Sequence, residues 1–402
     1  MKRIYDTIVQ NQLETDQEMV FLSGPRQVGK TTVSKNTATQ TDRFIYLNWD
    51  NEDHRKMILA GPSTIIEMYN PSVLTERKPI IVFDEIHKRP EWKNFIKGFF
   101  DTYGLECRLL VTGSARLDIY KYGGDSLMGR YFSYRMHPFS VAECLRTDLA
   151  PAEITAPAEI DPAEFTALYE FGGFPKPFLK RDRQFSVRWQ NLRKQQLIQE
   201  DIRDVNMIHD LNRLQLLMDC LKDRASQQIT YSTLAKLIRV SVDTVIRWID
   251  VLETFYYCYR IKPWSKNIVR SLIKEPKLFL WDWSLVKDPG ARAENFIGSQ
   301  LLKAVQNWTD RGLGEYDLYY IRTLEKKEVD FVVTKNGDAW FLVEVKLSDA
   351  RHLSPHLDEF QKQTKAAHAF QVVIDMPFVN QDCFVYNKPI IVPAKTLLSQ
   401  LV

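Results

Sequence analysis

Residues 24–31 read Gly-Pro-Arg-Gln-Val-Gly-Lys-Thr, a complete match to the pattern G-x-x-x-x-G-K-[ST]. The apolar run 19–22 before it predicts a short buried strand, and residues 32–35 after it predict the first turn of a helix. A glycine-rich loop between a strand and a helix turns successive backbone N–H groups toward an anion. The stretch therefore predicts a phosphate-binding loop, and the alternative is a glycine-rich turn with an incidental lysine.

Each part of this loop has an expected role toward a nucleoside triphosphate. Lys30 would bring a positive charge to the β and γ phosphates, and the Thr31 hydroxyl would be a ligand of Mg²⁺. ATP and Mg²⁺ are therefore the expected ligands. The residues expected to bind the nucleotide are Gly24, Pro25, Arg26, Gln27, Val28, Gly29, Lys30, Thr31 and Thr32.

The composition is that of a globular chain with more than one domain. A length of 402 residues suggests roughly two to three domains, and 45% hydrophobic with 26% charged residues is ordinary for globular proteins. The formal net charge of +3 is too small to indicate nucleic-acid binding by itself, so any basic surface must be local. The five cysteines stand far apart without a C-x-x-C pair, which disfavours a zinc site and a disulfide framework.

The sequence also predicts a cellular location. Residues 1–6 lack the apolar core of a signal peptide. No run approaches the roughly 18–20 apolar residues that a membrane helix needs. Together with the cysteine usage, these features predict a soluble cytoplasmic protein without a membrane partner.

The N-terminal third alternates strand-like and helical stretches. After the first strand, apolar runs follow at 44–47, 79–83 and 108–112. Such alternation predicts an α/β domain with a mainly parallel sheet. Three Pro-Ala-Glu triplets within 148–164 predict an exposed linker or loop.

The middle of the chain is predicted to be helical. Residues 186–210 carry many basic side chains, which fit a solvated helix face better than a nucleic-acid stripe. Residues 230–262 show a helix, a tight turn, a second helix and a strand, the pattern of a winged helix-turn-helix. Asp243 and Asp250 on the second helix weaken a role in reading DNA, so DNA contact and a pure packing role both stay open.

An acidic pair follows the strand-like run 79–83. The aspartate at this place in phosphoryl-transfer sites holds Mg²⁺, and an adjacent glutamate can polarise the attacking water. Asp84 and Glu85, together with Lys30, are therefore the expected catalytic residues. The alternative is an exposed acidic pair at a strand end, which the phosphate-binding loop upstream makes less attractive.

Hydroxyl side chains end the next strand-like run, 108–112. Thr112 and Ser114 could each contact the γ-phosphate or the attacking water, the role of a sensor residue. Either could instead occupy a turn and cap the next helix. The sequence favours a sensor without separating the two.

Six motifs follow one another in a specific order along the chain. They are Gly-Pro-Arg-Gln-Val-Gly-Lys-Thr (24–31), Phe-Asp-Glu-Ile-His (83–87), Thr-Gly-Ser-Ala-Arg (112–116), Met-Gly-Arg (128–130), His-Pro-Phe-Ser-Val-Ala-Glu (137–143) and Gly-Gly-Phe-Pro (172–175). With these motifs the chain resembles a prokaryotic family of AAA-like ATPases in which the ATPase module is followed by a C-terminal domain of unknown function. The resemblance implies an ASCE-type sheet and ATP hydrolysis, with Lys30, Thr31, Asp84 and Glu85 in the roles above, and it supplies no known target.

Arginines from a second subunit often complete sites of this kind. Arg116, Arg130 and Arg135 are the candidates, and Arg130 stands in the Met-Gly-Arg motif. Each could equally pair with acidic side chains of its own chain or face solvent. The sequence selects none of them, and it does not predict the oligomeric state.

Acidic residues and a lysine recur near the C-terminus. Asp330 lies in one predicted strand, and Glu344 and Lys346, two apart in the next strand, share a face. With Glu294 from the preceding helix, they resemble the core of PD-(D/E)xK nucleases, although Val329 replaces the proline of that motif. Asp330 and Glu344 would be the metal ligands for phosphodiester hydrolysis. The same fold also serves as a binding scaffold, and alternating charges on an exposed strand would look similar.

These observations predict an α/β protein of three parts. The expected parts are a P-loop ATPase domain with a parallel sheet at 1–180, a helical winged-helix-like unit at 181–265 and a restriction-endonuclease-like α/β domain at 266–402. The expected function is ATP hydrolysis whose cycle controls a C-terminal module that binds DNA or another partner. The alternatives are an ATP-gated nuclease and a nucleotide-binding switch without hydrolysis.

Overall fold

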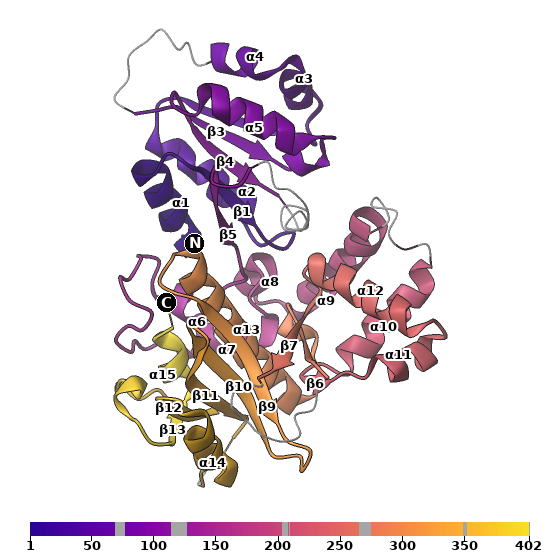
Figure 1. Cartoon of the computed structure of the whole chain (residues 1–402), viewed down its shortest axis with the longest axis vertical. Helices are drawn as coiled ribbons and strands as arrows, with labels where there is room; N and C mark the ends of the chain where they lie inside the picture. Colours follow the sequence, from indigo (N-terminus) through magenta and orange to yellow (C-terminus); the bar gives the residue numbers. More distant parts are fainter. Residues whose placement is uncertain are drawn as a thin grey trace. The chain divides into compact units, whose positions relative to one another are not determined.

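A computed structural model describes residues 1–68, 77–113, 127–202, 208, 210–264, 275–348 and 352–401. The chain forms two compact units (Figure 1). The first consists of Met1–His137 and Thr147–Leu149, and the second of Pro138–Arg146 and Ala150–Val402. The second unit therefore contains the segments 181–265 and 266–402 together with most of 138–180.

The first unit is built on a five-stranded sheet. The strand order is β2 (Phe44–Asn48), β3 (Ile80–Asp84), β4 (Arg108–Thr112), β1 (Met19–Ser23) and β5 (Tyr131–Arg135). All neighbouring strands are parallel. Every residue of β1 and β3 is buried, which explains their continuous apolar runs, because helices cover both faces of such a sheet. The predicted parallel sheet is confirmed.

Helices complete the first unit around this sheet (Figure 1). On one face, the ring of Phe83 in β3 meets the rings of Phe95 and Phe99 in α5 edge-on, with centroids 5.8 Å and 5.5 Å away. Such aromatic contacts hold α5 on the sheet beside the strand that ends in the acidic pair. The helices are α1 (Ile4–Thr15), α2 (Lys30–Asn36), α3 (Glu52–Ala60), α4 (Pro62–Glu67) and α5 (Trp92–Tyr103).

The second unit contains an eight-stranded mixed sheet in the order β13-β12-β11-β10-β9-β7-β8-β6. The strands β9, β10 and β11 are antiparallel neighbours, and β11, β12 and β13 are parallel. The short parallel pairing of β7 with β9 joins the two halves. The strands are β6 (Gln227–Gln228), β7 (Cys258–Pro263), β8 (Lys277–Leu280), β9 (Tyr316–Arg322), β10 (Glu328–Lys335), β11 (Asp338–Lys346), β12 (His368–Val373) and β13 (Ile390–Pro393).

The longest helix of the second unit, α13, packs against β9 and β11. Gly298 allows this close approach, because a Cβ there would lie 2.8 Å from the ring of Phe331 in β10. None of the described helices is both long and apolar enough to span a membrane. The helices are α6 (Val141–Leu145), α7 (Pro162–Phe171), α8 (Pro175–Lys180), α9 (Arg183–Gln196), α10 (Leu211–Lys222), α11 (Tyr231–Ile238), α12 (Val242–Thr254), α13 (Pro289–Asp310), α14 (Pro355–Thr364) and α15 (Ala394–Ser399).

The predicted helix, turn, helix and strand of the middle region are present as α11, α12 and β7. Arg239 ends α11 in a left-handed conformation with φ of 57°. Ser241 then caps α12, since its hydroxyl accepts a hydrogen bond from the backbone N–H of Thr244 at 3.1 Å. Of the predicted helical stretch 186–210, residues up to Gln196 belong to α9 and Leu197–Ile202 form a π-helix, while 203–207 and 209 lie outside the described residues.

Of the two predictions for the segment with the Pro-Ala-Glu triplets, the loop is confirmed for residues 151–160 and the exposed linker is wrong, while the third triplet begins α7. Thr155 donates its backbone N–H to the carbonyl of Gln400, and Ala158 donates to the hydroxyl of Ser399. Ile154 also forms an isolated bridge with Leu401. Composition missed this packing because the partners lie at the other end of the sequence.

Candidate functional site

The phosphate-binding loop lies between β1 and α2, as predicted. Gly24 and Gly29 have φ values of 150° and 112°, which residues with a Cβ rarely adopt. A Cβ on Gly24 would also overlap the carbonyl oxygen of Met136. Both glycines are therefore required by the backbone. The loop leads directly into Lys30, the first residue of α2.

The ammonium group of Lys30 lies across the loop. Its Nζ donates to the carbonyl oxygens of Gly24 and Pro25 at 2.7 Å and 2.8 Å. The residue is only 6% exposed. The loop thus holds a positive charge next to its own backbone, where it can meet the phosphates of a nucleotide.

Asp84 is the centre of a hydrogen-bonded cluster at the carboxyl ends of the strands. Thr31 Oγ1 donates to its Oδ2 at 3.0 Å, and Thr112 Oγ1 donates to its Oδ1 at 2.5 Å. Asp84 and Thr112 are direct partners in the parallel register of β3 and β4. The structure therefore brings together Thr31, Asp84 and Thr112, while Ser114 lies outside the described residues.

Sequence reasoning missed Tyr46 in β2. Its hydroxyl donates to Asp84 Oδ2, the same oxygen that accepts from Thr31. Burial, followed by the neighbouring Asp84, raises the pKa of this phenol, which keeps it protonated as a donor. The available signal was its place two residues before the end of a strand, on the same side as Asn48.

These oxygen atoms suit a magnesium ion. Mg²⁺ prefers hard oxygen ligands, commonly one or two protein oxygens together with the phosphates of a nucleotide. The hydroxyl of Thr31 and the carboxylate of Asp84 are adjacent and 3.0 Å apart. The donor set that the structure assembles thus fits the expected ion.

Glu85 follows Asp84 in a left-handed conformation with φ of 56°. Its Oε2 lies 3.5 Å from Lys88 Nζ and 3.6 Å from His87 Nε2. Lys88 also pairs with Asp50 at 2.6 Å. The carboxylate that is expected to activate water is therefore held by neighbouring basic groups. A non-glycine residue in this conformation, next to Asp84, is typical of functional sites.

Arg3 is a second residue that sequence reasoning missed. Its Nη1 donates to the carbonyl oxygen of Val28 in the phosphate-binding loop at 2.7 Å. Its Nη2 donates to the carbonyl oxygen of His137 at 2.6 Å. The residue is 4% exposed. The guanidinium of Arg3 thus connects the loop to His137, the last residue of the segment Met1–His137.

The arginine candidates have different environments. Arg130 forms a two-pronged pair with Asp101, with Nε to Oδ1 at 2.6 Å and Nη2 to Oδ2 at 3.2 Å. This bond is the first cause of a lowered pKa of Asp101. Arg135 ends β5, where its carbonyl accepts from Tyr5. Arg116 lies outside the described residues.

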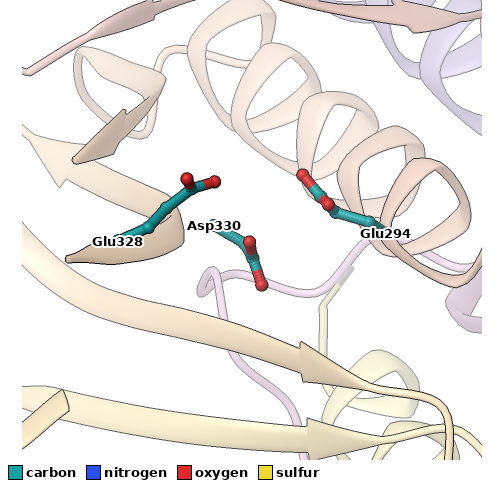
Figure 2. Close-up of side chains that lie close together, drawn as sticks. All are labelled: Glu294, Glu328 and Asp330. Carbon is teal, nitrogen blue, oxygen red and sulfur yellow. The ribbon is translucent and has the colours of Figure 1, made fainter. Parts of the chain in front are cut away.

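The C-terminal acidic residues lie on α13, β10 and β11. Glu294 from α13 faces Glu328 and Asp330 from β10, and one carboxylate oxygen of each lies within 4.8 Å of the others (Figure 2). Asp330 Oδ2 also accepts the backbone N–H of Val345 in β11 at 2.8 Å. Glu344 is not a member of that group of three.

Glu344 and Lys346 form a separate pair. Lys346 Nζ lies 2.8 Å from Glu344 Oε1. Burial and the negative charge of Asp330 raise the pKa of Glu344, while Lys346 acts in the opposite direction. The predicted residues are thus all in one region of the second unit, but they form two ionic groups.

The acidic cluster has its own cation, which sequence reasoning missed. Lys277 in β8 points its Nζ to Glu294 Oε1 at 2.7 Å and to Asp330 Oδ1 at 3.4 Å, and it pairs with Glu328. Its side chain is 3% exposed. Burial and then the charge of Asp330 raise the pKa of Glu294 to about 8, against the effect of Lys277. No sequence signal connects Lys277 to residues up to 53 positions away.

The first unit has a fold like that of a P-loop ATPase domain. Its parallel sheet and phosphate-binding loop agree with the match of residues 16–145 to the family model "AAA domain". Residues 163–288 and 289–387 match two models that are each described as a domain of unknown function, DUF8612 and DUF4143. The nuclease-like character of the C-terminal region is therefore not confirmed by these matches.

Two mycobacterial proteins are similar to most of this chain. "Uncharacterized protein Rv2008c" of Mycobacterium tuberculosis and "Uncharacterized protein Mb2031c" of Mycobacterium bovis are each 22% identical over 335 residues. The match covers 79% of this chain and 68% of each relative. Among solved structures, AMPPCP-bound DnaA from Aquifex aeolicus covers 61% of this chain and 86% of its own, with 15% identity and a TM-score of 0.31.

Proposed function

We propose that this chain binds and hydrolyses ATP with Mg²⁺ and that the nucleotide cycle controls the second unit. The observation that carries the proposal is the position of Asp84. Its two carboxylate oxygens accept from Thr31, which follows the phosphate-binding loop, and from Thr112 on the neighbouring strand. A P-loop threonine and a strand-end aspartate in contact are the pair that phosphoryl-transfer sites of this class use.

Each residue has a role that follows from its position. Lys30 stabilises the charge on the β and γ phosphates, and Thr31 with Asp84 would hold Mg²⁺, which neutralises phosphate charge when bound. Glu85 accepts a proton from the attacking water. Because its carboxylate lies beside Lys88 in the structure, it must move away from that ammonium group to act as a base.

Arg3 supports communication with the second unit. Within the first unit it joins Val28 of the loop to the carbonyl of His137. The next residue in the chain, Pro138, belongs to the second unit, where its carbonyl accepts from Lys303 of α13 at 3.0 Å. Lys303 is also paired with the buried Glu143. The backbone at 137–138 is therefore tied to the loop on one side and to α13 on the other.

The order of elements in the middle of the second unit supports a DNA-binding or partner-binding module. The sequence α10, β6, α11, α12, β7, β8 has three helices and an antiparallel β7–β8 pair, as in a winged helix. Asp250 and Glu253 on α12 are both paired with Arg260, at 2.6 Å and 2.5 Å, so one positive charge partly offsets two of the three acidic charges on this helix. Arg247 and Asp243 remain exposed on α12.

The test is an ATPase assay of the full chain with double-stranded DNA, single-stranded DNA and RNA at a stated salt concentration. Lys30→Ala should abolish turnover, and Glu85→Gln should lower it by about 100-fold or more while ATP still binds. Glu106→Gln, an exposed glutamate of the same unit, is the matched control. Unchanged turnover in Lys30→Ala would overturn the proposal.

If ATP binds but no phosphate is released with any partner, the chain is a nucleotide-binding switch that does not hydrolyse ATP. Stimulation by one polymer identifies the class of partner. If turnover is real but no nucleic acid changes it, the partner is a protein or small molecule and the DNA proposal fails.

A metal-dependent nuclease is the second candidate function. The observation in its favour is the convergence of Glu294 and Asp330, with Glu344 and Lys346 on the adjacent strand. Against it, the ammonium of Lys277 already occupies the centre of the acidic cluster.

Incubation of the full chain with DNA or RNA and Mg²⁺ or Mn²⁺ tests this candidate. Asp330→Asn should abolish cleavage, whereas Asp317→Asn on the exposed part of β9 should not. Cleavage that is equal in both variants would exclude the assigned residues.

A further inference from the structure

The second unit contains a cavity that belongs to neither candidate site. Its volume is about 540 Å³, and its walls come from α7, α9, α10, the residue before β7, the turn at Trp283–Leu285 and the beginning of α13. None of the residues assigned above to nucleotide binding or to the acidic cluster lines it. This volume lies in the range of pockets that hold cofactors and other small molecules.

The walls of the cavity carry an excess of positive charge. Six cationic and three acidic residues line it, which leaves an excess of three positive charges. Lys194 and Lys222 share Asp219, at 2.9 Å and 3.9 Å. The cationic residues in the walls are Arg183, Arg193, Lys194, Lys222, Lys287 and Arg292.

Three of these cations, Arg183, Lys287 and Arg292, have no carboxylate partner among the described residues. Arg292 Nε donates to the carbonyl oxygen of Val286 at 2.8 Å. Arg183 begins α9, and Lys287 precedes α13, and both side chains belong to exposed residues at the cavity. The positive charge that they add is therefore not neutralised by the protein. A cavity with uncompensated positive charge attracts anions, and its low-dielectric walls strengthen that attraction.

Arg193 is a rigid part of the wall. Its guanidinium lies 3.9 Å from the ring centroid of Phe174 and 4.0 Å from Asp282 Oδ2. Burial, the first cause, lowers its pKa, and Asp282 acts against that effect. The stacked and paired guanidinium cannot easily turn away, so a ligand finds a preorganised donor.

The motif Gly-Gly-Phe-Pro at 172–175, which the ATPase site does not use, builds this wall. The ring of Phe174 packs against the guanidinium of Arg193. A Cβ on Gly172, whose φ is 80°, would lie 2.7 Å from Asp282 Oδ1, and one on Gly173 would lie 2.7 Å from the ring of Trp283. The two glycines thus let the motif approach the segment that carries the partner of Arg193.

The remaining walls combine apolar and hydrogen-bonding groups. Phe171, Leu197 and Leu285 supply apolar surface, and Gln190 and Asn191 supply amides. Leu197 also begins the π-helix after α9, and such distortions often accompany functional sites. A bare inorganic anion would leave the apolar surface unused, whereas an organic phosphate would contact both kinds of wall.

We propose that this cavity binds a small phosphate ester of about mononucleotide size, with its phosphate near Arg183, Arg193 and Lys287. A phosphate ester carries up to two negative charges on one group, which matches a wall with several cations better than a single carboxylate does. The proposal does not depend on ATP hydrolysis, because the cavity lies wholly within the second unit.

Calorimetric titration of the full chain tests the proposal, with AMP and inorganic pyrophosphate as probes. All proteins carry Lys30→Ala, so that the phosphate-binding loop contributes little to the heat. The test protein adds Arg183→Glu and Lys287→Glu, and the matched control adds Lys176→Glu and Arg188→Glu, two exposed cations of α8 and α9 that do not line the cavity. Circular dichroism verifies that the two proteins are equally folded.

The expected result is binding of AMP that weakens at least about tenfold in the test protein and changes less than about twofold in the control. Binding of pyrophosphate with the same pattern also supports the site and shows that the phosphate group alone suffices. Two results overturn the proposal. One is the absence of binding of either probe up to about 5 mM. The other is an equal change in the test and control proteins.

Discussion

Replacing Lys277 with methionine would test whether the buried acidic cluster depends on its internal cation. Lys277 Nζ is 2.7 Å from Glu294 and 3.4 Å from Asp330, pairs with Glu328, and has a side chain only 3% exposed. Methionine keeps most of the apolar stem but removes the charge and all three donors. Removal of one partner from a buried ion pair costs about 3–5 kcal/mol. We expect a loss of this size, since three carboxylates then remain together.

The loss should grow with pH. Without the ammonium group, which lowers the pKa of Glu294 in the wild type, that pKa rises further above its unfolded value. A carboxyl with a raised pKa in the folded state favours folding at low pH, and this contribution is lost as the pH rises through the folded pKa. The deficit of Lys277→Met should therefore be larger at about pH 8 than at about pH 5.5.

Urea unfolding followed by tryptophan fluorescence measures this effect. Of the nine tryptophans, only Trp49 and Trp92 belong to the first unit, so the signal reports mainly on the second. Lys362→Met is the matched control, because Lys362 pairs with Asp358 on the surface of α14. Such exposed helical pairs contribute only about 0.3–0.5 kcal/mol.

Two results would refute the reasoning about Lys277. The first is a shift for Lys277→Met no larger than that for Lys362→Met at both pH values. The second is that millimolar Mn²⁺ raises the urea midpoint of the wild type as much as that of Lys277→Met, or raises neither. The ion should stabilise only the variant, because in the wild type the ammonium already occupies the centre of the cluster.

Three further variants test other parts of the structure. Gly24→Ala should weaken ATP binding at least about tenfold, because φ at this residue is near 150° and the new Cβ would overlap the carbonyl of Met136. Gly98→Ala is the control and should leave ATP binding unchanged, because a Cβ there meets nothing within 4 Å. Thr112→Val leaves Asp84 Oδ1 without its donor and should lower stability in urea by about 1–3 kcal/mol. The pKa of Glu294, raised to about 8, makes wild-type stability fall as the pH rises toward 8. Urea midpoints of Glu294→Gln at about pH 5 and about pH 8 should show a smaller fall.

Local patterns correctly predicted the strand, loop and helix that surround residues 24–31. The spacing of Gly24, Gly29 and Lys30 marks a loop whose geometry depends on neighbouring residues, so a sequence window contains nearly all of its information. Parallel strands bring their carboxyl ends to one edge of the sheet, which is why the structure places Asp84 and Thr112 together. Tyr46 was missed because a tyrosine in a buried strand is ordinary until its hydroxyl has a partner.

The C-terminal region was harder to predict. The alternation around Glu344 and Lys346 correctly indicated a strand with both side chains on one face. The acidic residues group differently from the prediction, because Glu328 rather than Glu344 lies with Glu294 and Asp330. Lys277, from another strand, pairs with this group. Pairing between distant strands has no local sequence signal, so these contacts could not be read from spacing.

By itself, the sequence determined the α/β class of the first unit, its phosphate-binding loop and the residues at the end of β3. These features depend on backbone conformations and hydrophobic periods that a few neighbouring residues impose. The tertiary structure alone decided that Arg3 holds the loop, that Lys277 pairs with the acidic cluster and that Phe174 lies against Arg193 at a cationic cavity. Each of these depends on burial that joins segments far apart in the chain, where a charge is stable only beside the partner that folding brings to it.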